Sequence, residues 1–347
     1  MRIDSPELGF AQFRAALNGP ITVELDDASR AALTRCRNTV LSLLEQDEPI
    51  YGVNTGFGQL ARQRIDEDDL ETLQKNIVRS HAAGTAEPLD DSVVRLILLL
   101  KIKSLARGFS GVRAELVDAL LALVNADVLP VVPRQGSVGA SGDLAPLAHL
   151  SLVLIGEGKA RHRGVELDGA AAMRRAQTAP LQLGPKEGLA LLNGTQVSTA
   201  LVLSGLIEAE RNLRAAVLAG ALSVDAVLGS DAPFDPRIHL LRGHQAQIDV
   251  AAHYRRLLAG SAIRASHAEC DRVQDPYSFR CQPQVMGACL EQLRHAAKLM
   301  RVEANAVTDN PLVFPEDGAV LSGGNFHAQP VAFAADGIAL AVAECGA

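Results

Sequence analysis

Apolar residues recur every three or four positions over most of the chain, a spacing typical of amphipathic helices. After Asp26 or Asp27, for example, Leu33, Cys36 and Val40 fall on one face. The pattern predicts helices, by residue number, over 26–48, 68–81, 91–107, 112–125, 187–228, 287–305 and from 330 onward.

Alternation of apolar and polar residues, which is typical of strands, is confined to short stretches. Residues 21–25 predict a short strand, 160–168 a hairpin that turns at Gly164, and 315–318 a second hairpin turn. We therefore expect a mainly α fold, a bundle of long helices with a few short strands and hairpins. The expected division is a loop-rich helical part over 1–185 and a long-helix part over 186–347.

The composition supports a helical core. Hydrophobic residues make up 48% of the chain and aromatic residues only 3%, with no Trp, so Ala, Leu and Val must fill the interior. Such residues favour closely packed helices over a β-sandwich. The net charge of −7 provides no basic surface for nucleic acid or an anionic membrane.

The cysteines indicate a reducing compartment. Their number is odd and no pair has Cys-x-x-Cys spacing, which argues against a disulfide framework; they are Cys36, Cys270, Cys281, Cys289 and Cys345. The N-terminus lacks the apolar core of a signal peptide, and no uninterrupted apolar run is long enough for a membrane span. We expect a cytoplasmic protein without a metal site, in which His239, His244 and His253 are solvated.

Residues 136–150 combine three glycines and two serines with a following apolar run. Glycine permits backbone conformations that are closed to other residues. In Ala140-Ser141-Gly142, the amide nitrogen of Gly142 can attack the Ala140 carbonyl carbon, and loss of two waters would leave a ring with an exocyclic methylidene. A loop followed by a helix cap is the commoner meaning of such a pattern, and Asp143 suits that cap. The glycine spacing does not fit the phosphate-binding fingerprints.

Five further positions stand in unusual surroundings. Tyr51 lies in a glycine-rich loop over 51–58, His81 at a helix end, and Asn193 in an Asn-Gly pair within a strongly apolar helix, where a broken local rule indicates a functional site. Arg280 lies between an Asp-Pro and a Gln-Pro turn, and its planar guanidinium suits the carboxylate of an amino acid. Phe326 follows a Gly-Gly-Asn sequence. From the residues alone, Tyr51 also fits a flexible surface loop, His81 a helix-end histidine that faces the core, and Arg280 a surface ion pair. Asn193 also fits a buried amide that joins two helices.

The stretch 136–158 resembles the signature of the aromatic amino acid ammonia-lyases, and its Asp-Leu-Ala-Pro-Leu-Ala-His version is most similar to the histidine-specific members. Residues 51–58, 76–84, 191–196, 266–284 and 322–328 resemble further segments of that family. The resemblance implies the long-helix fold of the fumarase and aspartase type. It also implies a 5-methylidene-imidazol-4-one group, formed autocatalytically from Ala140-Ser141-Gly142, without an external cofactor or metal.

The resemblance also implies roles for individual residues. Tyr51 would be the catalytic base, His81 would recognise the imidazole, and Arg280 would hold the substrate carboxylate. The remaining pocket residues would be Asn193, Gln274, Tyr277 and Phe326. Gln329 stands where the histidine-specific members are expected to have an acidic residue.

The activity implied is the conversion of L-histidine to trans-urocanate and ammonia, in a homotetramer whose active sites are shared between subunits. Family members continue past the position of residue 347 through a helical segment with a substrate-binding glutamate, so we expect this chain to correspond to roughly their N-terminal two thirds. A phenylalanine or tyrosine ammonia-lyase, an aminomutase, and a non-catalytic helical assembly subunit remain as alternatives.

Overall fold

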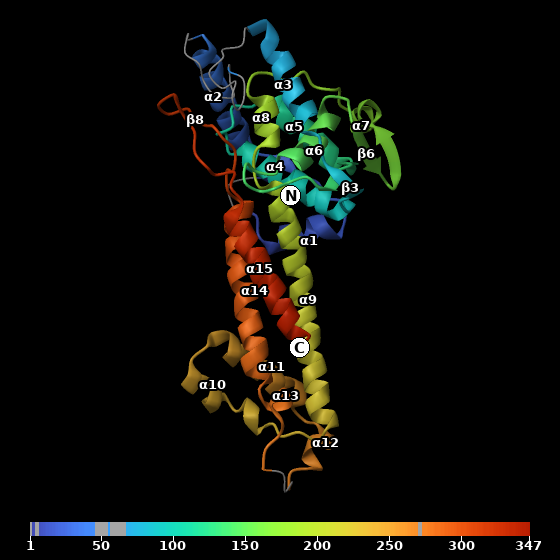
Figure 1. Ribbon diagram of the computed structural model, residues 1–347, viewed down its shortest axis with the longest axis vertical. Coiled ribbons are helices and arrows are strands. Elements are labelled where there is room, and N and C mark those ends of the chain that lie inside the picture. Colours follow the sequence, from blue (N-terminus) through green and yellow to red (C-terminus); the bar gives the residue numbers. More distant parts are fainter. Residues whose placement is uncertain (1, 4–6, 46–54, 56–66, 270–272) are drawn as a thin grey trace. The chain divides into compact units, whose positions relative to one another are not determined.

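The computed structural model describes residues 2–3, 7–45, 55, 67–269 and 273–347 (Figure 1). The chain folds into two compact units. Unit 1 comprises residues 1–201 and 301–331, and unit 2 comprises 202–300 and 332–347. Helices dominate both units, which confirms the expected fold class.

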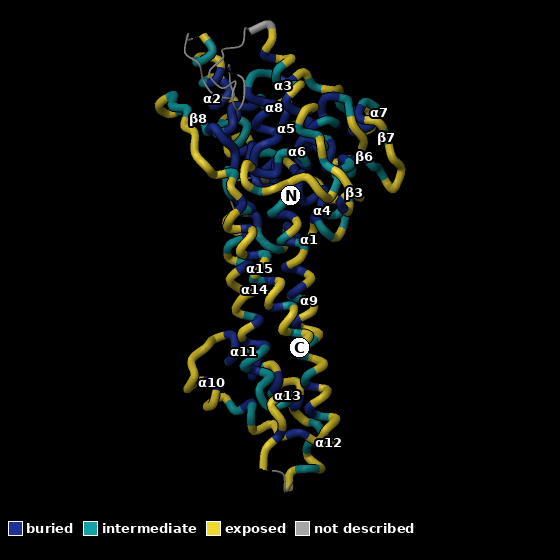
Figure 2. Tube along the Cα trace, in the orientation of Figure 1, coloured by how far each residue is buried: buried dark blue, intermediate teal, exposed yellow. Residues whose placement is uncertain are grey.

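Unit 1 is built around α4 (Asp91–Ala106), whose residues from Val93 to Ala106 are buried. Helices α1, α2 and α5 pack against α4, and α3, α6 and α8 pack against one another. Figure 2 shows this interior as a continuous buried region. The other helices of unit 1 are α1 (Phe10–Asn18), α2 (Asp27–Leu44), α3 (Glu67–His81), α5 (Ala114–Asn125), α6 (Leu144–Leu154), α7 (Gly169–Arg175), α8 (Glu187–Leu192) and the start of α9 (Gln196–Ala226).

Short strands border the helices of unit 1. The predicted hairpin is confirmed as β6 (Lys159–His162) and β7 (Val165–Asp168), and β4 (Val128–Pro130) pairs with β6 as a third strand. A second predicted hairpin is confirmed as β8 (Leu312–Phe314) and β9 (Ala319–Leu321). The remaining pairs are β1 (Arg2–Ile3) with β2 (Glu24–Leu25), which are parallel, and β3 (Thr85–Pro88) with β5 (Pro133–Gln135), which are antiparallel.

Unit 2 contains the later part of α9, most of α14 (Gln282–Ala304), the part of α15 (Gln329–Cys345) from Ala332, and several shorter helices. The Tyr254 hydroxyl donates to Oε1 of Gln282 at 2.9 Å, and the Tyr254 ring stacks on Phe234 at 4.8 Å. These contacts join the short helices to α14. The short helices are η2 (Ala232–Phe234), α10 (Pro236–Arg242), α11 (Gln245–Leu258), α12 (Ala262–Ala265) and α13 (Tyr277–Arg280).

The expectation for His239 was wrong, because its side chain is buried rather than solvated. Nε2 donates to the Pro233 carbonyl at 3.0 Å and Nδ1 accepts from Nε2 of Gln247 at 2.8 Å. Burial lowers the pKa of the imidazole. The proline-interrupted stretch folds into η2, α10 and α11, which enclose the ring and satisfy both of its nitrogens.

Within the described residues, one helical stretch, Glu187–Ala226, has the length and composition of a membrane span, although no stretch was expected to qualify. It consists of α8 and α9, and 72% of its most apolar window is buried inside the protein. A buried core helix meets the same criterion, so burial accounts for its apolar character.

Candidate active site

The Ala140-Ser141-Gly142 loop connects β5 to α6 in unit 1. Ala140 and Ser141 are exposed, whereas Gly142 is buried. Gly142 has φ +83°, in the left-handed region that favours glycine. A Cβ at this position would lie 2.8 Å from the Gly194 carbonyl oxygen and 2.9 Å from the Gly194 nitrogen. The chain therefore requires glycine at 142 for both its conformation and its close approach to Gly194.

The sequence predicted one helix over 187–228, but the helix is interrupted at Asn193, Gly194 and Thr195. The Gly194 carbonyl accepts from the Asp143 amide at 2.8 Å, and Nδ2 of Asn193 donates to the Asn310 carbonyl at 3.1 Å. Oδ1 of Asn193 is buried, has no hydrogen-bond partner among the described residues, and lies 3.2 Å from the Cβ position at Gly142. The interruption thus places an amide oxygen, free to accept, beside the Ala-Ser-Gly loop.

Asp143 lies at the N-cap position of α6, as expected, but its side chain makes no capping bond to that helix. The buried carboxylate instead accepts from the Ser198 amide at 2.8 Å, the Ser198 hydroxyl at 2.6 Å and the Ser137 hydroxyl at 2.6 Å. Asp143 therefore caps the first turn of α9 and ties it to the Ala-Ser-Gly loop.

Two buried lysines below the loop were not identified from the sequence. Nζ of Lys101, on α4, donates to the Asn193 carbonyl at 2.7 Å. Nζ of Lys186 forms an ion pair with Asp309 at 2.7 Å, and both of these side chains are almost completely buried. The available signal for Lys101 was its position within the apolar run 96–105, because charged residues are rarely buried without a partner.

His81 ends α3 and is half-buried, and its Nδ1 lies 2.8 Å from the Ile77 carbonyl oxygen. Three residues later, the Gly84 amide donates to Nε2 of His149 on α6 at 3.0 Å. Burial lowers the pKa of the His149 imidazole, in agreement with a ring nitrogen that accepts this bond. The Gly84 Cα would be 3.1 Å from a Cβ at Gly136, so the end of α3 and the start of the Ala-Ser-Gly segment are close neighbours.

Residues 322–328 also contact the segment that contains the Ala-Ser-Gly loop. The Ala328 amide donates to the Gly139 carbonyl at 2.9 Å, and the Gly323 amide donates to Oδ1 of Asn310 at 2.7 Å. Phe326, two residues before Ala328, is half-buried. Unit 1 thus brings Ala140, Ser141 and Gly142 together with Asn193 and the segment that carries Phe326.

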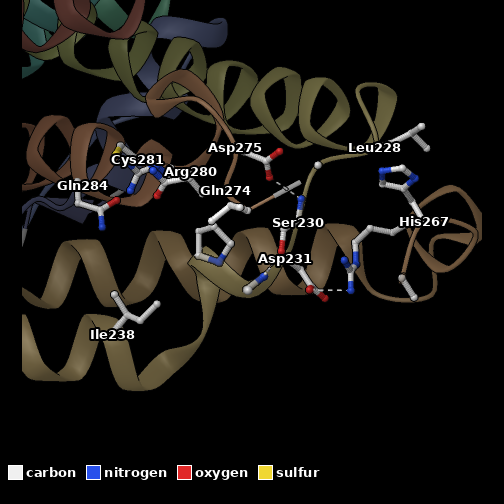
Figure 3. Close-up of a pocket in the computed structure, with 16 residues that line it drawn as sticks. Leu228, Ser230, Asp231, Ile238, His267, Gln274, Asp275, Arg280, Cys281 and Gln284 are labelled. Carbon is white, nitrogen blue, oxygen red and sulfur yellow. Dashed lines mark hydrogen bonds and ion pairs between the residues drawn. The ribbon is translucent and has the colours of Figure 1, made fainter. Parts of the chain in front are cut away.

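Gln274, Tyr277 and Arg280 lie in unit 2. Gln274 and Arg280 line a cavity of about 580 Å³, in which Arg280 and Gln284 lie on one side and His267 on the other (Figure 3). Cζ of Arg280 lies 4.6 Å from the centre of the Tyr277 ring, and Tyr277 is 73% exposed. Nε of Arg280 is buried without a hydrogen-bond partner among the described residues. The cavity therefore presents a guanidinium with unused donor capacity.

Tyr51 lies outside the described residues. The described part of the chain contains no group of three or more His, Cys, Asp or Glu side chains placed to hold a metal ion.

The sequence matches the family described as aromatic amino acid lyase over residues 8–347. It is 60% identical over 340 residues to a histidine ammonia-lyase of Burkholderia cenocepacia (strain HI2424), covering 98% of this chain and 67% of the relative. The structure is similar to that of histidine ammonia-lyase from Trypanosoma cruzi, with a TM-score of 0.89 and 37% identity over 100% of this chain and 65% of the other. It is also similar to Pantoea agglomerans phenylalanine aminomutase, with a TM-score of 0.91 and 31% identity over 98% and 69%. This chain thus spans about two thirds of the length of these proteins.

Proposed function

Because this chain belongs to the aromatic amino acid lyase family, we propose that it removes ammonia from L-histidine to give trans-urocanate. The electrophile for the reaction would be a 5-methylidene-imidazol-4-one group made from Ala140, Ser141 and Gly142. Identity of 60% with a histidine ammonia-lyase supports this substrate over phenylalanine or tyrosine. The structural observation that carries the proposal is the enclosed position of Gly142 against Asn193 and Gly194.

Ring closure uses only atoms of the chain. The Gly142 nitrogen bonds to the Ala140 carbonyl carbon, and the carbonyl oxygen leaves as water with the protons of the Gly142 and Ser141 amides. The Ser141 hydroxyl leaves as a second water with the Cα proton of Ser141. Gly142 fits this role because it is folded into the left-handed region with no room for a Cβ. The unpartnered Oδ1 of Asn193 lies at the same place and can accept a hydrogen bond from the substrate side.

When formed, the group supplies an electrophilic carbon that makes the substrate amine a better leaving group. The protein side chains orient the substrate around it. Arg280 provides paired donors for the carboxylate, and Gln274, Tyr277 and Phe326 shape the pocket. Tyr51 removes the β-proton, which requires the pKa of its phenol to be lowered from about 10.

His81 supplies selectivity for imidazole. A carbonyl oxygen can only accept, so Nδ1 of the neutral ring donates to Ile77 and Nε2 stays an acceptor. Nε2 can then receive a hydrogen bond from a ring N–H of histidine, which a phenyl ring cannot donate. We expect His81→Leu to raise the KM for histidine much more than it changes melting temperature.

We also propose a homotetramer whose active sites are shared between subunits, as the family resemblance implies. We place the protein in the cytoplasm, in keeping with the free thiols of Cys36, Cys281, Cys289 and Cys345.

Intact-mass measurement followed by turnover assays tests the proposal. The purified chain should lack two waters, and peptide mapping should locate the loss to residues 140–142. Urocanate and ammonia should form from histidine, with little product from phenylalanine or tyrosine. Preferred turnover of phenylalanine or tyrosine would identify a lyase or aminomutase of the other specificity. An unmodified mass with no turnover would indicate a helical assembly subunit.

A further inference from the structure

Lys101 is an unexpected residue for its position. It lies in the buried stretch of α4, its side chain is 1% exposed, and its neighbours in sequence are Leu99, Leu100 and Ile102. Removing an ammonium group from water costs several kcal/mol, and well-packed apolar residues are often equally or more stabilising at such positions. The fold alone therefore gives no reason for an amine in this helix.

Among the described residues, Lys101 directs its hydrogen bond at the candidate active site, because Nζ donates to the Asn193 carbonyl at 2.7 Å. That carbonyl belongs to the Asn193–Gly194 peptide, against which Gly142 is packed. Since a Cβ at Gly142 would approach the oxygen and nitrogen of Gly194 to 2.8 and 2.9 Å, the two segments are already as close as glycine allows. A displacement of this peptide by a few tenths of an ångström would change the wall that shapes the Ala-Ser-Gly loop.

Two groups that flank this peptide are held by other hydrogen bonds. The Asp143 amide holds the Gly194 carbonyl, and the Asn310 carbonyl holds the Asn193 side chain. Neither contact fixes the carbonyl of Asn193, which Lys101 engages from α4. The amine therefore completes the set of hydrogen bonds that orient this peptide.

The hydrogen bond from Lys101 persists whether or not its amine is protonated. Burial, assisted by Lys186, lowers the pKa of its ammonium against the opposing effects of Asp309 and Asp143, and the resulting pKa is about 7. Both the protonated and the neutral amine carry an N–H to donate, so the bond to Asn193 does not depend on the charge.

We propose that Lys101 is a positioning residue for ring closure, which holds the Asn193–Gly194 peptide against Gly142 so that the Ala140–Gly142 loop adopts a reactive geometry. This inference rests on the proposed self-made electrophile. It assigns to Lys101 an effect on the rate of closure and not on the stability of the fold.

The experiment follows ring closure in the full 347-residue chain made by cell-free translation, with intact mass recorded over time. Lys101→Met keeps the length and apolar stem but removes the donor. Lys103→Met is the matched control, because it removes the other buried lysine of α4, two residues along and hence on roughly the opposite face. Lys101→Arg restores a donor. Thermal melting of each variant reports the fold.

We expect Lys101→Met to slow the loss of two waters at least tenfold while its melting temperature stays within a few degrees of the unaltered chain. Lys103→Met should close at the normal rate, and Lys101→Arg should close faster than Lys101→Met. Normal closure in Lys101→Met would overturn the proposal and leave the proposed function intact. Failure of Lys101→Met to fold, with Lys103→Met folded, would show a structural role and also overturn it. If the unaltered chain never loses two waters, both the proposed function and this inference are wrong.

Discussion

The Ala-Ser-Gly region of unit 1 and the 273–284 region of unit 2 are assigned to one reaction but are built in opposite ways. In the first, Gly142 and Asp143 are buried, and Asn193 and Gly194 are held by hydrogen bonds with Lys101, Asp143 and Asn310. In the second, Val273 is 98% and Tyr277 73% exposed. A chemical change within the backbone needs atoms held at reacting distance, whereas a clamp for an incoming carboxylate needs donors that are still available. Substitutions in the first region should therefore change both the stability of the fold and the activity. Substitutions in the second region should change the activity and leave the stability nearly unaltered.

The largest effect is expected from Gly142→Ala. The added Cβ would collide with Gly194 backbone atoms, in a conformation that alanine rarely adopts. We expect no loss of two waters, turnover reduced at least about a thousandfold, and a destabilisation of about 1–3 kcal/mol. Intact mass, turnover and chemical unfolding measure these.

The control is Gly164→Ala, because Gly164 has φ +80° but nothing within 4 Å of its Cβ position. Gly164→Ala should lower the free energy of unfolding, because alanine disfavours this φ, without any effect on ring closure. Equal closure in the two variants would contradict the argument from close approach.

Arg280→Lys tests the other half of the comparison. A lysine keeps the charge but loses the planar pair of donors, so kcat/KM for histidine should fall by about 10- to 100-fold, corresponding to a loss of one charge-assisted hydrogen bond. The melting temperature and ring closure should not change. Arg264→Lys is the control, since Arg264 lines the same cavity but is already paired with Asp231 at 2.6 Å. Equal losses in both variants would count against the clamp.

Glu187→Gln tests the coupling of unit 1 stability to pH. Burial acts to raise the pKa of Glu187, but hydrogen bonds from Arg113 and from the Gly184 amide outweigh it and hold the pKa below its ordinary value. The stabilisation is therefore complete above the unfolded pKa of about 4.3 and is lost as the pH falls through the folded pKa. Urea unfolding should show a loss of about 2 kcal/mol in the variant at about pH 7, discounted because Arg113 is 37% exposed.

The difference between Glu187→Gln and the unaltered chain should shrink in unfolding experiments as the pH falls below the unfolded pKa and through the lower folded pKa, where the carboxyl group becomes protonated in both states. A difference that is constant with pH would mean that the shape of Gln, rather than the lost charge, causes the destabilisation.

The smallest effect is expected from Tyr277→Phe. The ring stays available to Arg280, and the exposed hydroxyl contributes little to the fold, so the free energy of unfolding should change by less than about 0.5 kcal/mol. Turnover of histidine should fall only a few-fold if the hydroxyl contacts substrate. A large loss of stability would show that this region is as tightly built as the Ala-Ser-Gly region.

Elements with a local cause were predictable from the sequence. Apolar periodicity located α4 and α5, and the small residues of 136–142 indicated a sharply bent loop. The break at Asn193 could not be predicted in the same way, because it depends on contacts with Thr308 and Asn310, more than one hundred residues away. The strand β3 was also missed, since its residues are all exposed and lack an alternating pattern.

The predicted site residues show the same distinction. Asn193 could be identified because an Asn-Gly pair breaks the local rule for an apolar helix, and the structure places it beside Gly142. Lys101 gave only a weak signal, because its role depends on which carbonyl lies above α4. Asp143 was located correctly at the start of α6, yet its carboxylate serves α9, a choice determined by tertiary packing and not by the local sequence.

The contact between Gly139 and Ala328 has a consequence for quality control of the protein. Gly139 contacts Ala328 and Gly142 contacts Gly194, and both contacts need most of unit 1 to be synthesised and folded. Because the closed ring is covalent, it would remain in a molecule that later unfolds, and it would show that this molecule once reached its native state. In a chain recovered from an aggregate, a mass lower by two waters would mean that the chain folded first and unfolded later. An unmodified mass would mean that the chain misfolded before ring closure.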